Sequence, residues 1–586
     1  MSTGLRVALG IRKLLRSDRV DALQEVDAVR AEIDEASRTL RNAPAAEMQR
    51  LSEGRSSVIC LGTTTDASGE PLVLSLREAE IRSGGHWLVT GATGAGKSFE
   101  ALGVIMQLLS RQPRGLVVID MKGELAGLLR KTALPSLVAS LPEPRARMLI
   151  RRIAVIAPFD ESATPPFQVL ARDSSIPIEL QASEVASSFG NTIGRDLGVL
   201  QSTVLKYAII LAIDVGLSLP DVPELLQSDA LLSGAVARTS LPEVRAYFAN
   251  RFPRERAASV ASLLSRIDSL LMHPTLKRML STDRMIRFDR LLEQAITVID
   301  LGGAPAGMSE VSRFFGQLLF QKIVRAIFAR KVREDSPPVT VIADEFQAML
   351  VPDIASDFER VLTLARSQRV FLWCLFQQAA QVEAVSPTLL QILRANTNYQ
   401  ATFRANLQDA RLMSHILPVT GTVQRERQGF PDPRTPAQTL TADEERRILV
   451  EQVPSLPDRS FWFWNRRRQY PAQLMRSPTI RLDRLEQRAE SLGPVRDIVS
   501  RGVLALSREE LANAERRRAE LRAALLQGDA PARGAAEGPG ARMSEAATRM
   551  TDETLSVDTP WDGPAPEDGP ERPPKAGRRR RGTHLG

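Results

Sequence analysis

The octapeptide GATGAGKS, at Gly91–Ser98, is the feature of this 586-residue sequence that most constrains its fold. It follows the apolar run HWLVT and precedes FEALGVIMQLLSRQ, in which apolar residues recur at helical spacing. Glycines permit the tight backbone curvature that a loop needs when a strand leads directly into a helix. The octapeptide therefore predicts a strand–loop–helix unit of an α/β domain, and it has the pattern of a phosphate-binding P-loop.

A P-loop binds a nucleoside triphosphate mainly through its backbone. Its consecutive amides and the N-terminus of the following helix point at phosphate oxygens. Lys97 is expected to bring its charge to the terminal phosphates, and Ser98 to supply a hydroxyl ligand to magnesium. ATP and magnesium are the expected cofactors. The predicted nucleotide-binding residues are Gly91, Ala92, Thr93, Gly94, Ala95, Gly96, Lys97 and Ser98.

The run VTVIADEF, residues 339–346, predicts a second strand that ends in two carboxylates. In a P-loop fold, Asp344 at such a strand end is expected to hold magnesium through water. Glu345 is expected to polarise the attacking water as a general base, a role that needs a carboxylate within about 3 Å of that water. The alternative interpretation is a charged strand end that meets a loop.

Downstream, the run ARSQRVFLWCLFQQAAQV predicts the end of a helix, an apolar strand and a loop. Gln377 follows the strand, at the edge where doubly wound sheets bind ligands, and could sense the terminal phosphate. Arg366, at the end of the helix, could contact the nucleotide of a neighbouring subunit as an arginine finger. The alternative for Arg366 is a solvated arginine at the end of a helix.

Short apolar runs alternate with helical patterns on both sides of a segment that has only helical periodicity. This alternation predicts an α/β fold with a mainly parallel sheet covered on both faces. The end of the chain is rich in Gly, Pro and acidic residues, which is typical of disorder. The expected units are an N-terminal helical segment at 1–56, an ATPase domain in two parts at 57–171 and 288–485, an all-helical insertion at 172–287, C-terminal helices at 486–527 and a disordered tail at 528–586.

Composition adds weaker constraints. The formal net charge of +8 and a pI near 9.8 permit contact with nucleic acid without establishing it.

Cys60 and Cys374 stand in apolar surroundings, so we expect buried thiols and no disulfide. The segment FWFWNRRRQYPAQLMRSP, residues 461–478, fits either a strand with packed aromatic rings or a base-stacking surface. No run approaches about 20 uninterrupted apolar residues, so no transmembrane segment is expected.

The motif set resembles the FtsK and HerA superfamily of P-loop translocases, and within it the coupling-protein ATPases of conjugative DNA transfer by type IV secretion. The likeness covers about residues 58–480, and GATGAGKS, VVIDMKGEL, PFQVL, VIADEF, ARS, FQQAAQ and ATFRANLQDARLM carry it. The resemblance implies a RecA-like fold, a homohexameric ring and ATP-driven pumping of DNA through its pore. It also implies that Arg366 is the arginine finger, with Arg404 in ATFRAN as the second candidate.

The sequence departs from the coupling proteins that it resembles in one respect, since those carry N-terminal transmembrane helices. We therefore expect a cytoplasmic protein, or one held peripherally at the inner face of the membrane. Its expected partners are DNA, further copies of itself, and a relaxase, a secretion channel or a nuclease. Two alternatives stay open: an ATPase that powers protein export or secretion assembly, and a nucleotide-gated regulatory module in which turnover is incidental.

Overall fold

The computed structural model describes residues 58–65, 71–77, 81–82, 84–111, 115–160, 162, 164–174, 176–192, 198–282, 284–305, 309–334, 336–419, 441–468 and 472–527. The helical segment expected at 1–56 and the tail expected at 528–586 lie outside the described residues.

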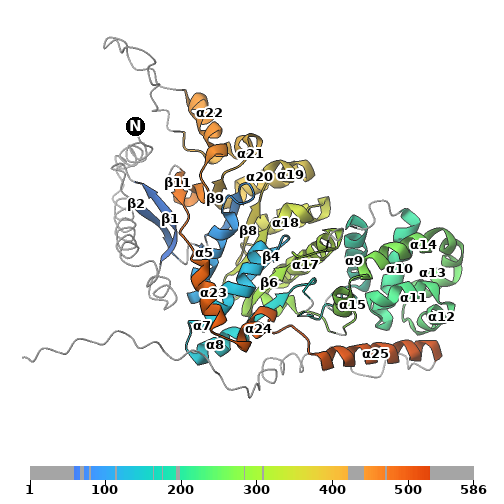
Figure 1. Cartoon of the computed structure of the whole chain (residues 1–586). Helices are drawn as coiled ribbons and strands as arrows, with labels where there is room; N and C mark the ends of the chain where they lie inside the picture. The colour runs from blue at the N-terminus through green and yellow to red at the C-terminus, as the bar shows by residue number, and fades with distance from the viewer. Residues whose placement is uncertain are drawn as a thin grey trace, which may run out of the picture.

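One 11-stranded sheet organises the chain, with the strand order β2-β1-β11-β10-β9-β3-β8-β7-β4-β6-β5 (Figure 1). Its parallel part comprises β9 (Thr397–Phe403), β3 (His86–Thr90), β8 (Val370–Phe376), β7 (Val339–Asp344), β4 (Leu116–Asp120), β6 (Ile296–Asp300) and β5 (Ile153–Ile156). An antiparallel extension adds β10 (Ser460–Asn465), β11 (Gln473–Arg476), β1 (Val58–Thr65) and β2 (Pro71–Arg77). The predicted α/β class with a mainly parallel sheet is confirmed. Strand β8 separates β3 from the acidic strand β7, as in RecA-like P-loop folds.

The parallel strands end at one edge of the sheet, which we call the carboxyl edge, and begin at the opposite, amino edge. They are apolar on both faces, as strands covered on both sides must be. In β4, Val117 and Ile119 belong to one hydrophobic core, and Leu116 and Val118 belong to another. Burial on both faces explains why these strands are continuous apolar runs with no alternation.

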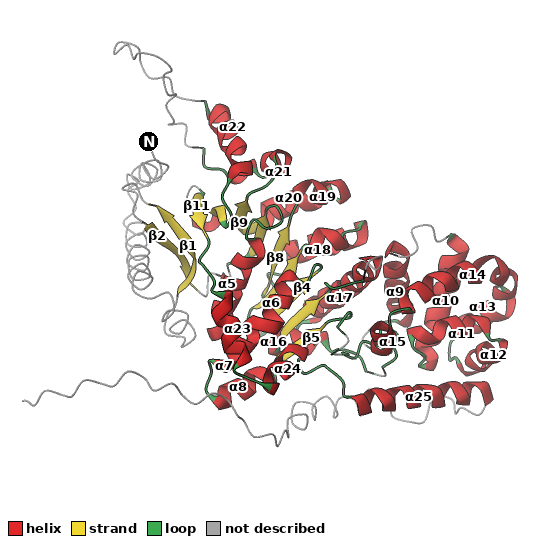
Figure 2. Ribbon diagram, in the orientation of Figure 1, coloured by secondary structure: helices red, strands yellow, loops and turns green. Residues whose placement is uncertain are grey.

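Helices cover both faces of the sheet (Figure 2). The core that contains Val117 receives α16 (Phe288–Gln294), α17 (Ser309–Ala329), α18 (Pro352–Leu364), α19 (Ala379–Val385) and α20 (Pro387–Asn396). The core that contains Leu116 receives α5 (Lys97–Arg111), α6 (Glu124–Leu128), the π-helical turn η1 (Leu129–Ala133), α7 (Leu134–Ala139), α8 (Glu143–Ile150), α23 (Leu482–Glu490) and α24 (Pro494–Arg501). The short turn η3 (Phe346–Met349) follows β7.

Between β5 and β6 the chain forms a group of helices beside the sheet (Figure 1). These are α9 (Ile178–Thr192), α10 (Val199–Val215), η2 (Leu219–Asp221), α11 (Val222–Gln227), α12 (Asp229–Arg238), α13 (Pro242–Asn250), α14 (Phe252–Leu271) and α15 (Pro274–Leu280). Helix α9 packs on α17, and the apolar residues of this group join the core on that face of the sheet. The domain boundaries themselves stay a prediction.

A smaller apolar cluster lies around β10. It contains Trp462 together with residues of α21 (Leu407–Leu412), η4 (Ser414–Ile416), α22 (Ala442–Gln452) and η5 (Val453–Ser455). The strand interpretation of FWFW is confirmed, and Phe461, Trp462 and Phe463 are buried. These three rings are therefore not available to stack on bases. The turn η6 (Arg466–Arg468) follows the strand.

Residues 494–527, which we call the C-terminal strap, connect the sheet to the inserted helices. Helix α23 begins at Leu482, so it crosses the boundary expected at 485. Beyond α24, the backbone amide of Val503 donates to the carbonyl of Ile153 on the edge strand, at 2.8 Å. Helix α25 (Arg508–Gln527) then runs along the inserted helices (Figure 1). Arg518 Nε lies 2.7 Å from Oδ1 of the fully buried Asp221 in η2.

Cys374 is buried in β8, but Cys60 is only half-buried, so the expectation that both thiols are buried is wrong for Cys60. Cys60 lies in β1, within the antiparallel extension and next to the edge strand β2. Among the described residues, only the bent helix pair Val199–Val215 and Leu219–Gln227, with 117° between its helices, has the length and composition of a membrane span, and no single helix does.

Candidate nucleotide-binding site

The P-loop connects β3 to α5 at the carboxyl edge, and two of its glycines have no room for a side chain. Gly91 has a φ of 152°, and a Cβ there would lie 2.6 Å from Cβ of Phe403. Gly96 has a φ of 112°, and a Cβ there would lie 3.0 Å from Cα of Arg459. Both backbone conformations favour glycine. The curvature predicted for this loop therefore depends on close packing against β9 and against the residue that precedes β10.

Lys97 reaches back across the loop that precedes it. Its ammonium donates to the carbonyls of Gly91, at 2.7 Å, and Ala92, at 3.2 Å. It also lies 3.9 Å from Oε1 of Glu345. Burial lowers the pKa of Lys97, and the carboxylates of Glu345 and Asp344 oppose that shift. The predicted phosphate-binding lysine is thus a buried cation beside the two predicted acidic residues.

Ser98 and Asp344 meet at the start of α5. The hydroxyl of Ser98 donates to Oδ2 of Asp344 at 3.0 Å, and the buried Oδ1 of Asp344 has no hydrogen-bond partner among the described residues. Burial raises the pKa of Asp344 to about 7, and the carboxylates of Asp120 and Glu345 add to that rise. A hydroxyl beside a carboxylate with an unpartnered oxygen fits magnesium, which takes oxygen ligands and retains waters.

Glu345 has an unusual backbone and several side-chain partners. Its φ of 55° and ψ of 35° are left-handed, a conformation that costs a non-glycine residue of order 1–3 kcal/mol and is common at functional sites. Gln377 Nε2 donates to Oε1 at 2.7 Å, and Gln347 Nε2 donates to Oε2 at 2.6 Å. Lys122 Nζ lies 3.6 Å from Oε2. Gln377 therefore contacts the predicted general base, and sequence reasoning missed the contacts of Gln347 and Lys122.

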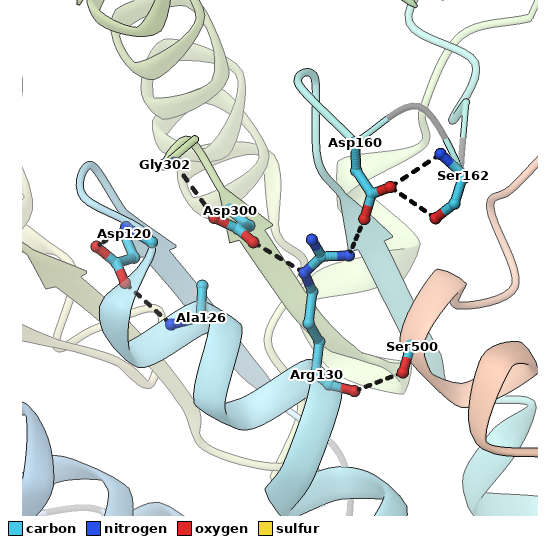
Figure 3. A network of polar contacts seen from close by, with 9 residues as sticks. Asp120, Ala126, Arg130, Asp160, Ser162, Asp300, Gly302 and Ser500 are labelled. Atoms are coloured by element: carbon cyan, nitrogen blue, oxygen red, sulfur yellow. Dashed lines mark hydrogen bonds and ion pairs between the residues drawn. The ribbon is translucent and has the colours of Figure 1, made fainter. Parts of the chain in front are cut away.

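Three aspartates lie side by side where neighbouring strands end. Asp120 of β4 is in register with Asp344 of β7 on one side and with Asp300 of β6 on the other. Asp300 accepts from Arg130 Nε at 2.8 Å, and Arg130 Nη1 donates to Asp160 at 2.6 Å (Figure 3). Sequence reasoning missed Arg130, Asp160 and Asp300. Asp300 could have been predicted, because the apolar runs GLVVID and TVID both end in aspartate, and a parallel sheet brings such strand ends to one edge.

The two arginine candidates lie at opposite edges of the sheet. Arg404 follows β9 at the carboxyl edge, where its carbonyl accepts from Ala92 N at 2.7 Å and its guanidinium pairs with Asp458 at 2.7 Å. Arg366 lies in the turn before β8, at the amino edge, and its Nη2 donates to the carbonyl of Asn396 at 2.9 Å. The seven residues of β8 span roughly 23 Å. Arg366 is thus not brought to the P-loop of its own chain.

Comparison with known proteins adds information on the fold. No protein-family model matches the sequence, and neither does any curated protein. The structure is similar to solved coupling and secretion ATPases. The bacterial conjugative coupling protein TrwB, in a form lacking 70 N-terminal residues, is 14% identical, with a TM-score of 0.45 over 74% of this chain and 91% of that one. VirB4 of Thermoanaerobacter pseudethanolicus is 13% identical, with a TM-score of 0.47 over 73% and 98%.

A third similar structure is the cytoplasmic domain of the type VII secretion ATPase EccC of Thermomonospora curvata. It is 15% identical, with a TM-score of 0.26 over 77% of this chain and 31% of that chain. At these identities the likeness concerns the fold alone.

Proposed function

We propose that this protein is an ATP-hydrolysing motor that moves DNA as a homohexameric ring. The observation that carries the ATPase part is the convergence of Lys97, Ser98, Asp344 and Glu345 at the carboxyl edge. These groups come from two segments about 250 residues apart in the chain, and each has the side-chain chemistry that phosphoryl transfer to water requires.

Each residue has a distinct part in the proposed reaction. Lys97 and the P-loop amides bind and orient the phosphates, and charge stabilisation of this kind is the main contribution to phosphoryl transfer. Ser98 and Asp344 would hold magnesium, which neutralises charge on the phosphates when bound. Glu345 accepts the proton of the attacking water as the bond to the terminal phosphate breaks. Gln377 holds the carboxylate of Glu345 in place through its 2.7 Å hydrogen bond.

The position of Arg366 supports the proposed ring. This residue lies at the amino edge and is exposed, so in its own chain it is separated from the phosphates by the length of β8. A ring in which the amino edge of one chain faces the carboxyl edge of the next would bring Arg366 to a neighbour's nucleotide. Arg404, already beside the P-loop, is the second candidate for contact with the nucleotide.

The choice of DNA as cargo rests on the motif likeness to conjugative coupling proteins and on the net charge of +8. An ATPase that powers protein export or secretion assembly is the alternative. DNA transfer and protein export are the two processes to separate. The proposed partners are a relaxase or a secretion channel for the first, and a nuclease for a DNA-processing role.

The test is the ATPase rate of the purified full chain at low salt, with and without single- and double-stranded DNA. A DNA motor shows a rate that DNA stimulates and that salt suppresses, because phosphate contacts release counterions. A protein-export ATPase hydrolyses ATP without a response to either form of DNA. Lys97→Ala protein is the control for contaminating activity, and a DNA-independent rate would overturn the DNA assignment.

A further inference from the structure

Lys122 is a cation beside the proposed general base that the mechanism above does not use. Its Nζ lies 3.6 Å from Oε2 of Glu345, while Lys97 lies 3.9 Å from Oε1 of the same carboxylate. The charge of Lys122 also contributes to lowering the pKa of Lys97, so the two ammonium groups are close enough to repel each other. The two lysines thus flank one carboxylate, Lys97 buried and Lys122 with 41% of its side chain exposed.

The backbone that carries Lys122 is held in place by the end of β4. Oδ1 of Asp120 accepts from the amides of Lys122 and Gly123, both at 2.9 Å. Its Oδ2 accepts from Ala126 N at 2.9 Å (Figure 3). Gly123 has a φ of 81°, and a Cβ there would lie 2.6 Å from Oδ1 of Asp300. The turn at Lys122 and Gly123 is therefore held by Asp120 at the end of β4 and packed against Asp300 at the end of β6.

The side chain of Lys122 is not fixed in the same way. It has a flexible four-carbon stem, and among the described residues Glu345 is the one carboxylate that pairs with it. A pair at 3.6 Å with a partly exposed lysine is weak, because solvent screens the charge of the lysine and because the lysine loses rotamer freedom. A stronger anion within reach would displace the carboxylate from Lys122.

We propose that Lys122 is a second phosphate-binding lysine that exchanges partners with the state of the nucleotide. It pairs with Glu345 when the terminal phosphate is absent, and with that phosphate when ATP is bound. A terminal phosphate carries more charge than a carboxylate and presents three oxygens, so it is the stronger acceptor. This inference rests on the proposed ATPase function, and it concerns how the same site distinguishes ATP from ADP.

The exchange has a consequence for Glu345. Without Lys122 as a partner, Glu345 keeps Lys97 at 3.9 Å and the neutral amides of Gln347 and Gln377, which orient the carboxylate. The base is then released from one of its two cations only when a terminal phosphate is present to be attacked. Lys122 contacts the terminal phosphate in this scheme, and its effect is on the discrimination between ATP and ADP as well as on turnover.

The first experiment measures the affinity of the full chain for a non-hydrolysable ATP analogue and for ADP by calorimetry, in wild type, Lys122→Ala and Lys122→Arg. We expect the alanine variant to bind the analogue about tenfold more weakly and ADP within about twofold of wild type, with arginine restoring most of the loss. Lys131→Ala, which removes an exposed lysine nine residues further along, is the matched control for net charge. Equal losses for both nucleotides, or no loss, would overturn the proposal.

The second experiment tests the exchange itself with a double-mutant cycle. Glu345→Gln removes the carboxylate that competes for Lys122. We expect this substitution to tighten binding of the analogue more when Lys122 is present than in Lys122→Ala protein, and we expect no such difference for ADP. Equal gains in both backgrounds would show that Lys122 does not exchange between the two anions. If wild type binds neither nucleotide, the proposed function itself fails, and this outcome is distinct from both results above.

Discussion

The two edges of the parallel sheet carry opposite chemistry. At the carboxyl edge, Asp344, Asp120 and Asp300 stand in a row, and the cations that face them, Lys97 and Arg130, are buried and paired. At the amino edge, arginines gather around the segment that leads into β9. These are Arg366, Arg394, Arg466 and Arg467.

The partners of the amino-edge arginines are neutral. Arg366 and Arg466 donate to backbone carbonyls of Asn396 and Ala395, and Arg394 donates to the ring of His415. Within the part of the chain that the structure describes, none of these four arginines pairs with a carboxylate. Burial and the neighbouring Arg467 and Arg466 lower the pKa of Arg366. The carboxyl edge thus pairs its buried cations with carboxylates of the same chain, whereas Arg366, Arg394 and Arg466 at the amino edge donate to neutral groups. The ring proposed above would use this difference.

Loss of Lys97 should have the largest effect on nucleotide binding, because it removes the buried cation of the P-loop. In Lys97→Ala protein we expect nucleotide binding to fall by at least about 100-fold, since two charge-assisted contacts are lost together. Calorimetry with ATP and magnesium measures the change. Binding within a few-fold of wild type would contradict the assignment of the P-loop.

Loss of Arg366 should affect turnover more than binding. If this residue stabilises the transition state in a neighbour's site, Arg366→Ala should reduce the ATPase rate by about 10³-fold while the affinity for ATP changes little. Arg245→Ala, which removes an exposed arginine of α13, is the matched control.

Mixing the two variant proteins tests whether the carboxyl edge of one subunit meets the amino edge of another. Lys97→Ala subunits keep an intact amino edge, and Arg366→Ala subunits keep an intact carboxyl edge. A mixture of the two inactive proteins should therefore partly restore hydrolysis if the edges of different chains meet. A mixture as inactive as its components would contradict a role for Arg366 between subunits.

Glu345→Gln should not weaken nucleotide binding, and it should reduce hydrolysis by about 10²-fold or more, because an amide cannot accept the proton of the attacking water. Single-turnover hydrolysis by the purified protein measures this change. The same variant tests the regulatory alternative in cells, since a nucleotide-gated module keeps its biological activity when turnover is lost.

The smallest predicted effect is the pH dependence of magnesium-dependent nucleotide binding. Metal binding needs the ionised carboxylate, and the pKa of Asp344 is raised to about 7, so affinity should rise with pH through that range. We expect binding about tenfold weaker at pH 6 than at pH 8 in the presence of magnesium, with a smaller dependence in a chelator. Equal affinity at both pH values would show that Asp344 is not the titrating ligand.

Much of the carboxyl edge could be predicted because its residues follow directly from strand ends. GATGAGKS and VTVIADEF each combine an apolar run with its chemical groups, and a parallel sheet brings such ends together. The contacts of Arg130 could not be predicted in this way, because its carboxylate partners Asp160 and Asp300 lie 30 and 170 residues away and its side chain leaves a π-helical turn. The same holds for Lys122, whose contact with Glu345 depends on how one turn is folded against the next strand.

The sequence predicted one strand between Arg366 and Gln377, and β8 is that strand. Because a strand has its two ends at opposite edges of the sheet, the two residues lie at opposite edges. The cluster around Arg366 was not predicted, because Arg394, Arg466 and Arg467 come from other elements that the register of β9 and β10 brings together.

The C-terminal strap has a consequence for the order in which the chain becomes complete during synthesis. Asp221, in the inserted helices, and its partner Arg518 are 297 residues apart. At about 5–20 residues per second, a ribosome needs about 15 to 60 s to travel from one to the other. During that interval the inserted helices have emerged with the carboxylate of Asp221 lacking its guanidinium, and the face that α25 will cover is open to solvent and to chaperones.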